Sequence, residues 1–304
     1  MICKFIKHCF FILAFGFITN VNAQSVQVID GAIQAPFSVS PTKQVYFSQG
    51  NLQYRPSTKT WRFAEHQYDI RLYNSIEVNA SYNNWFDKFG FATSGWFTEN
   101  RTYKPYLRSS RPDDYYIEES SDNDMVGEYA NADWGVYNAI SNGGNKAGMW
   151  RTLTVEEWEY LLVERPLADE LCKYVMLDGA HVGICILPDN YFDVYDPTFK
   201  FSPREITYRD RYNNIMSYSV DADVSMDDWI ALETKGAVFL WLHFSTSKPE
   251  YNTMYWTATH GTAVDIADMI RFYKEERYKR GEVYRREEHW VSFNYVRLVQ
   301  DINN

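Results

Sequence analysis

Apolar residues recur at helical spacing in a segment that opens with a strong N-terminal signal. Thr154 to Glu157 has the sequence of a capping box, in which the Thr hydroxyl and the Glu carboxylate each bind a backbone N–H that has no partner within the helix. Trp158, Leu161 and Leu162 then fall on one face, and Pro166 ends the segment. The pattern predicts a helix buried along this face.

A second segment repeats the arrangement. Ser225 to Asp228 opens it, with Asp in place of Glu at the last position, and Trp229 and Leu232 form its apolar face. Gly236 stands where a helix often ends in a left-handed conformation. We therefore expect a second helix here.

Short alternating or fully apolar runs predict strands over much of the remaining chain. They lie at residues 44–48, 52–54, 61–64, 237–242, 255–256, 266–273 and 291–299. Residues 70–125 show little periodicity but hold many aromatic residues, which predicts a long structured loop region. The fold class expected is α+β, with short strands, two well-signalled helices and long structured loops.

The segment from Cys172 to Cys185 is predicted to be a β-hairpin around an Asp178-Gly179 turn of type I′. A two-residue turn pairs residue 177 with residue 180 and, continuing outward, residue 172 with residue 185. The two cysteines would then face each other on one side of the hairpin, where a disulfide can form. Such a bond would contribute about 3 kcal/mol. The alternative is a pair of reduced, partly buried thiols.

The N-terminus has the three parts of a secretory signal. Lys4 and Lys7 form a basic start, an apolar run follows from Cys9 to Ile18, and Val21 and Ala23 suit a signal peptidase. The apolar run is shorter than the about 20 residues needed to span a bilayer. We expect a signal peptide at 1–23, an extended lead at 24–43 and a single domain at 44–304. The alternative is an uncleaved anchor or a buried N-terminal helix.

Export places the protein in the periplasm, on the cell surface or outside the cell, without a transmembrane segment after cleavage. Removal of the signal leaves 28 basic and 40 acidic residues, a formal charge of −12. This acidic balance argues against nucleic acid as a partner, because binding to phosphates requires a basic face. The 24 Tyr and 10 Trp exceed what a core alone requires and leave aromatic residues for surface contacts.

Several segments together resemble a known pattern. They are Val45–Tyr54, Trp61–Ala64, Trp85–Gly90 with Thr93–Gly95, Asp133–Asn145, Trp150–Trp158, Ile186–Asp189, Gly236–Leu240, Tyr255–Thr257 and Val296–Val299. In this order they resemble a family of exported bacterial proteins similar to the major-paralogue domain. More remotely they resemble the formylglycine-generating enzymes and the C-type lectins. The match spans about residues 37 to 300, and it implies a C-type-lectin-like fold.

The motifs that give these families their chemistry are missing. Formylglycine-generating enzymes use a cysteine pair in the C-terminal half, and residues 186–304 contain no Cys. Calcium-dependent lectins carry Glu-Pro-Asn or Gln-Pro-Asp and a later Trp-Asn-Asp, and this chain has no equivalent. The sequence also lacks His-Glu-x-x-His, paired-cysteine zinc motifs and Gly-x-Ser-x-Gly. We expect no cofactor, no metal site and no catalytic residues of these types.

Some lectin-like proteins present a variable binding surface before the last strand, and the matching stretch here is Thr257 to Trp290. Arginine lies beside Tyr and Trp in it, a combination typical of binding hot spots. The candidate ligand-binding residues are Arg271, Tyr273, Arg277, Tyr278, Arg280, Tyr284, Arg286 and Trp290. The alternative is a solvated, charged hairpin without a ligand.

These observations favour an exported, non-enzymatic binding protein with a glycan or protein ligand. One alternative is a secreted polysaccharide hydrolase with a carboxylate pair, since acidic pairs are frequent in the chain. Another is a structural component of a surface assembly.

The hairpin hypothesis predicts that changing Arg277, Tyr278, Arg280 and Tyr284 together to Ala abolishes ligand binding. The measurement is binding of residues 24–304 to a glycan array, with and without calcium. Unchanged binding by the folded variant would contradict the assignment of the site to this hairpin.

Overall fold

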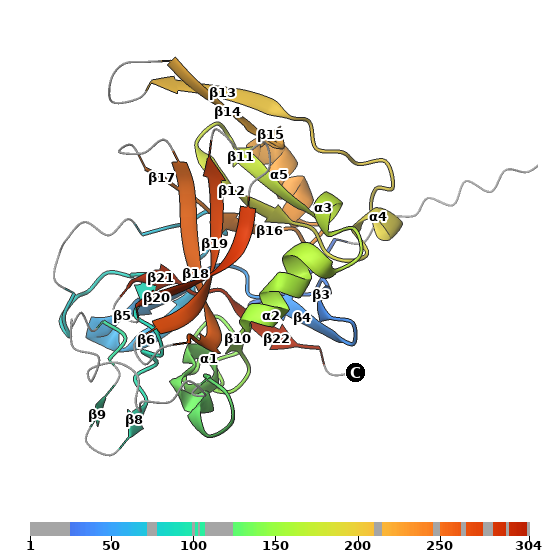
Figure 1. Cartoon of the computed structure of the whole chain (residues 1–304). Helices are drawn as coiled ribbons and strands as arrows, with labels where there is room; N and C mark the ends of the chain where they lie inside the picture. Colours follow the sequence, from blue (N-terminus) through green and yellow to red (C-terminus); the bar gives the residue numbers. More distant parts are fainter. Residues whose placement is uncertain are drawn as a thin grey trace, which may run out of the picture.

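The computed structural model describes residues 25–71, 78–98, 101–102, 104–106, 124–209, 215–245, 250–262, 266–275, 282–289 and 292–302. The expected signal peptide lies outside them. Within them the fold is α+β, with short helices and mostly small sheets (Figure 1). No helix of the described part of the chain is long and apolar enough to cross a membrane.

The strands are β1 (Val28–Ile29), β2 (Ala32–Ile33), β3 (Phe37–Ser40), β4 (Lys43–Phe47), β5 (Leu52–Arg55), β6 (Thr60–Phe63), β7 (Lys88–Phe89), β8 (Phe97–Thr98), β9 (Arg101–Thr102), β10 (Arg151–Thr152), β11 (Cys172–Leu177), β12 (His181–Ile186), β13 (Arg204–Arg209), β14 (Ile215–Val220), β15 (Ala222–Val224), β16 (Val238–Trp241), β17 (His243–Ser245), β18 (Glu250–His260), β19 (Ile266–Glu275), β20 (Glu282–His289), β21 (Asn294–Tyr295) and β22 (Leu298–Asp301). The helices are η1 (Pro56–Thr58), η3 (Gly127–Ala132), α1 (Trp134–Tyr137), α2 (Val155–Glu159), its π-helical continuation η4 (Tyr160–Glu164), α3 (Ala168–Leu171), α4 (Tyr191–Val194) and α5 (Met226–Glu233).

Both helices expected from their N-terminal signals are present. The Thr154 hydroxyl accepts a bond from the Glu157 backbone N–H at 3.3 Å, and the Glu157 carboxylate accepts one from the Thr154 N–H at 3.0 Å. At α5 the Ser225 hydroxyl accepts from the Asp228 N–H at 3.1 Å. Gly236 follows α5 with φ +89°, the left-handed conformation that the sequence predicts. Both helix starts and the Gly236 conformation are therefore confirmed.

The two ends of the described chain meet in one small sheet. Its strand order is β10-β22-β4-β3, so the last strand pairs directly with an early one. The predicted lead at 24–43 forms β1, β2 and β3, and β3 pairs with β4. Phe37 and Val39 of this lead are buried in the main core. The lead contributes strands and core side chains to the folded body.

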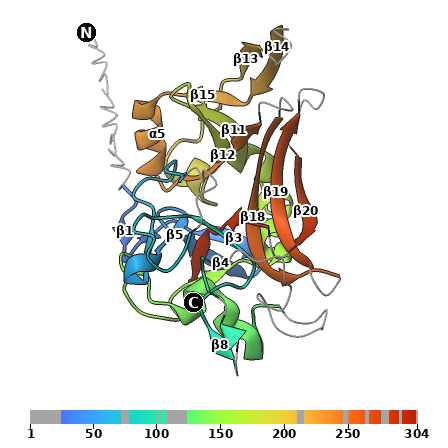
Figure 2. The ribbon, with the colours of Figure 1, turned by 90° about the vertical axis from the view of Figure 1, so that its left-hand side faces the viewer.

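Two further sheets pack above this base. One has the order β20-β19-β18-β21-β7, with β17 added to β18, and its long strands form a tall curved wall on one side of the molecule (Figure 2). The other has the order β15-β11-β12-β16. Helix α2 joins the parts, because the Trp158 ring lies 5.8 Å from the Phe47 ring and 6.4 Å from the Phe272 ring.

The hairpin of β11 and β12 differs from the prediction by one residue. Asp178 and Gly179 have the positive φ of the expected turn, but Ala180 is added to the loop, so Leu177 pairs with His181. Cys172 therefore pairs with Ile186 and not with Cys185. Both faces of the hairpin are largely buried, so no alternation of apolar and polar residues fixes the register.

This register overturns the geometry on which the Cys172–Cys185 disulfide was predicted. Neighbouring residues of a strand point to opposite faces, so the two thiols lie on opposite sides of the hairpin. Both cysteines are free in the structure. The alternative of two reduced thiols describes the structure.

Asp87 is a buried carboxyl that precedes β7. Its Oδ2 accepts a hydrogen bond from the Arg71 N–H at 2.7 Å, whereas Oδ1 has no hydrogen-bond partner among the described residues. Burial raises the pKa of Asp87 to about 7, against an ordinary value of 3.8. The folded state therefore holds a proton between about pH 4 and pH 7 that the unfolded state releases. The stability that the protonated Asp87 carboxyl contributes is fully present below pH 4 and is lost as the pH rises to 7.

Asp87→Asn should stabilise the protein more at pH 8 than at pH 5, by on the order of 2 kcal/mol, because an amide imitates the protonated carboxyl and does not lose a proton between these pH values. Urea unfolding at the two pH values measures this. Asp193→Asn, at an exposed site on α4, is the control and should show no such difference. An equal effect of Asp87→Asn at both pH values would contradict the assignment.

Candidate functional site

The residues predicted to bind ligand are only partly described. The β19–β20 ladder brings Arg271 opposite Tyr284, and Tyr273 and Arg286 each lie two positions from this pair. Arg271 is half-buried. Arg277, Tyr278, Arg280 and Trp290 lie outside the described residues. The backbone thus brings four of the eight candidates to neighbouring positions on two long strands.

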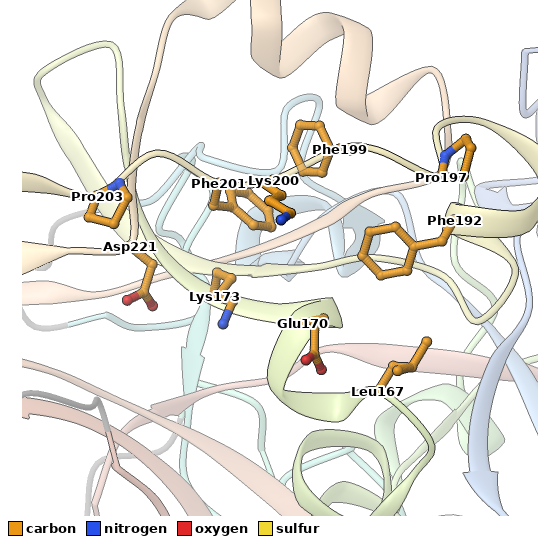
Figure 3. A pocket seen from close by; sticks show the side chains of 10 residues that line it. All are labelled: Leu167, Glu170, Lys173, Phe192, Pro197, Phe199, Lys200, Phe201, Pro203 and Asp221. Atoms are coloured by element: carbon orange, nitrogen blue, oxygen red, sulfur yellow. The ribbon is translucent and has the colours of Figure 1, made fainter.

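A pocket that the sequence did not predict lies on another side of the fold. Its volume is about 460 Å³, and it lies between α3, the start of β11 and the segment that follows α4 (Figure 3). We call it the aromatic pocket. It is lined by Leu167, Glu170, Lys173, Phe192, Pro197, Phe199, Lys200, Phe201, Pro203 and Asp221.

One buried ring supports the aromatic wall of this pocket. Tyr191 is fully buried at the start of α4, and its ring lies 5.7 Å from the Phe192 ring and 5.4 Å from the Phe199 ring. Phe199 and Phe201 meet edge to face at 4.9 Å. Such pairs fix ring positions beyond what area burial alone achieves. The wall is therefore pre-formed although its segment is largely irregular.

The three Phe side chains of the wall remain half-buried, with part of each accessible to solvent. Half-exposed Phe rings around a hollow leave apolar surface for another molecule to cover.

Leu167 faces the aromatic wall from the opposite side and has an unusual backbone. Its φ is 60° and its ψ is 23°, in the left-handed region, and its side chain is 55% exposed. This conformation costs a non-Gly residue about 1–2 kcal/mol. Strained residues concentrate at binding and catalytic sites. The exposed Leu167 at the rim is therefore a candidate contact residue for a ligand.

Four charged residues surround the apolar surface: Glu170, Lys173, Lys200 and Asp221. The Asp221 carboxylate is held in place because it accepts a hydrogen bond from the Tyr174 N–H at 2.9 Å. Two acids and two bases give this rim a balanced charge within an acidic protein. The arrangement suits a ligand with an apolar centre and charges of both signs around it.

Cys172 adjoins the pocket residue Lys173 without having the properties of a nucleophile. Burial raises the pKa of its thiol, although Arg165 lies beside it with Nη2 3.4 Å from Sγ. Among the described residues, no group of three or more His, Cys, Asp or Glu side chains is placed to hold a metal ion.

No protein-family model, curated protein or solved structure matches this chain. The resemblance to the major-paralogue and lectin-like families stays a prediction.

A signal for the aromatic pocket exists in the sequence. Residues 191–203 hold five aromatic residues and two prolines without helical or strand periodicity. Aromatic residues in such an irregular segment can fill a core, line a surface or do both. Here Tyr191 fills the core, whereas Phe192, Phe199 and Phe201 pack against the core and also line the pocket.

Leu167→Gly should stabilise the fold by about 1 kcal/mol, because Gly adopts a positive φ without steric penalty. It should also weaken any ligand that fills the aromatic pocket. Urea unfolding measures the first effect. Lys59→Gly, at another residue of positive φ (51°) outside the pocket lining, is the matched control and should stabilise without affecting binding. A loss of stability in Leu167→Gly that Lys59→Gly does not share would show that the contacts of the Leu167 side chain contribute more than its positive φ costs.

Proposed function

We propose that this chain is an exported, non-enzymatic binding protein and that the aromatic pocket receives an apolar side chain of a protein ligand. The observation that carries the proposal is the set of half-exposed rings of Phe192, Phe199 and Phe201 around a pre-formed hollow. Protein interfaces commonly combine an apolar anchor pocket with a polar rim.

The chemistry of the lining supports binding over catalysis. The described lining residues include no His, Ser or Cys that could act as a nucleophile or base beside a carboxylate. Asp221 is engaged by the backbone of Tyr174. A Phe-, Leu- and Pro-lined hollow matches an aliphatic or aromatic side chain better than it matches the hydroxyl-rich surface of a sugar.

A C-type-lectin-like fold is part of the same proposal. The segments that carry the resemblance fall on framework elements: Trp150 to Trp158 covers β10 and the start of α2, and Val296 to Val299 enters β22. Trp150, Trp158 and Trp256 are buried, which supports a framework role for them. The described members of the β19–β20 hairpin would offer a second contact surface in this proposal.

The test is selection of a random 12-residue peptide library on residues 24–304, run in parallel with a glycan array. We expect selected peptides to carry an apolar anchor flanked by charges. Phe199→Ala should weaken the selected peptide by 2 kcal/mol or more, about thirtyfold, because hot-spot side chains dominate such contacts.

Val28→Ala is the control, because Val28 is 53% exposed on β1 and does not line the pocket. It should leave peptide affinity unchanged. Selected peptides that bind Phe199→Ala as tightly as the parent would place the site elsewhere. Glycan binding without any peptide binding would replace the protein ligand by a sugar.

A further inference from the structure

A second, smaller pocket opens where β7, β17, β18 and β21 meet. Its volume is about 330 Å³, and its described lining is Lys88, His243, Thr253, Met254, Ser292, Phe293, Asn294 and Tyr295. We call it the Lys88 pocket. None of these residues lines the aromatic pocket, so a ligand could bind here whether or not the aromatic pocket has the proposed function.

Its charged lining is basic. Lys88 and His243 are the titratable residues of this described lining whose charged form is positive, and Lys88 supplies the charge at neutral pH. This is unusual in a chain with 40 acidic and 30 basic residues. A concave basic surface on an acidic protein concentrates anions locally.

Lys88 has no ion-pair partner among the described residues. Its Nζ lies 4.8 Å from the centre of the Tyr295 ring, a cation–π contact, and the side chain is half-buried. The adjacent carboxyl, Asp87, accepts its hydrogen bond from the Arg71 N–H and forms no ion pair with Lys88. The charge of Asp87 offsets the burial of the Lys88 ammonium only in part, because burial still lowers the pKa of Lys88, and an anion from outside would compensate the ammonium further.

The pKa values agree with this geometry. Burial lowers the pKa of Lys88, and burial together with the charge of Lys88 lowers the pKa of His243. Each group is thus destabilised in its charged form by its surroundings. A bound anion would reverse both shifts.

The rest of the lining provides an apolar surface and hydrogen-bond donors for a ligand. Met254 and Phe293 are half-buried and apolar, and the ring of Tyr295 lies beneath the ammonium. Thr253, Ser292 and Asn294 add groups that can donate hydrogen bonds. We propose that the Lys88 pocket binds a small carboxylic acid, with the carboxylate at Lys88 and His243 and an apolar body on Met254 and Phe293.

The test compares benzoate with benzamide, which has the same shape without the charge, by ligand-detected NMR on residues 24–304. We expect benzoate to bind and benzamide to bind at least tenfold more weakly, because a charge-assisted hydrogen bond is lost. Lys88→Met and His243→Gln should each weaken benzoate about tenfold or more, and Lys88→Arg should retain it.

Lys235→Met is the matched control, because Lys235 also lies over a tyrosine ring, that of Tyr191 at 5.8 Å, but outside this pocket. It should leave benzoate affinity unchanged. Equal binding of benzoate and benzamide, no binding of benzoate, or unchanged binding by a folded Lys88→Met protein would each overturn the proposal. Circular dichroism of every variant establishes that it is folded.

Discussion

The buried guanidinium of Arg297 is the constraint on which the arrangement of the main elements depends. The residue is 1% exposed, and its Nη2 donates to the Gln67 side-chain oxygen at 2.6 Å. Gln67 also accepts from the Phe239 N–H at 2.9 Å and donates to Glu233 at 3.0 Å. Burial lowers the pKa of Arg297 to about 10, so it stays charged at neutral pH. The counter-charge is the Glu233 carboxylate, which is connected to Arg297 through the Gln67 side-chain amide and does not contact the guanidinium directly.

This network ties the C-terminal segment to the far side of the fold. Next to Arg297, the carbonyls of Val296 and Leu298 accept bonds from the N–H groups of Leu52 at 3.0 Å and Ser48 at 2.9 Å. Gln67 meanwhile holds β16, which pairs with β12 and through it with β11. Removing the guanidinium's partner would leave an uncompensated buried charge, which is strongly unfavourable. The early strands, the last strand and the sheet beneath the aromatic pocket are thereby fixed relative to one another.

A second buried arginine performs a similar task beside the aromatic pocket. Arg165 donates to the Asp189 carboxylate at 2.8 Å and to the Leu187 carbonyl at 3.0 Å, and Asp189 also accepts from Ser38 at 2.7 Å. These bonds hold the chain two residues before Leu167. A strained conformation persists only where its surroundings over-determine it. The ion pair of Arg165 and Asp189 therefore explains how Leu167 is kept at a positive φ while its side chain stays exposed.

The parts of the fold that could be predicted are those with local causes. Thr154 and Ser225 mark helix starts because a cap acts within three residues, and Gly236 marks a conformation that other residues avoid. The pairing of Cys172 could not be predicted, because one added residue, Ala180, shifts a ladder whose two faces are both buried. The order of strands within the sheets likewise depends on contacts between segments far apart in the sequence.

The aromatic pocket shows the same limit for a candidate site. The surplus of aromatic residues predicted a contact surface in addition to a core, and that surface was assigned to the charged hairpin because Arg and Tyr are adjacent there. In the aromatic pocket, Lys173 and Phe199 are separated by 25 intervening residues and come together only because Tyr191 is buried beneath Phe199. Burial of that ring depends on the core and not on its neighbours in sequence. A binding surface whose rings and charges come from separate segments thus requires the folded chain before it can be recognised.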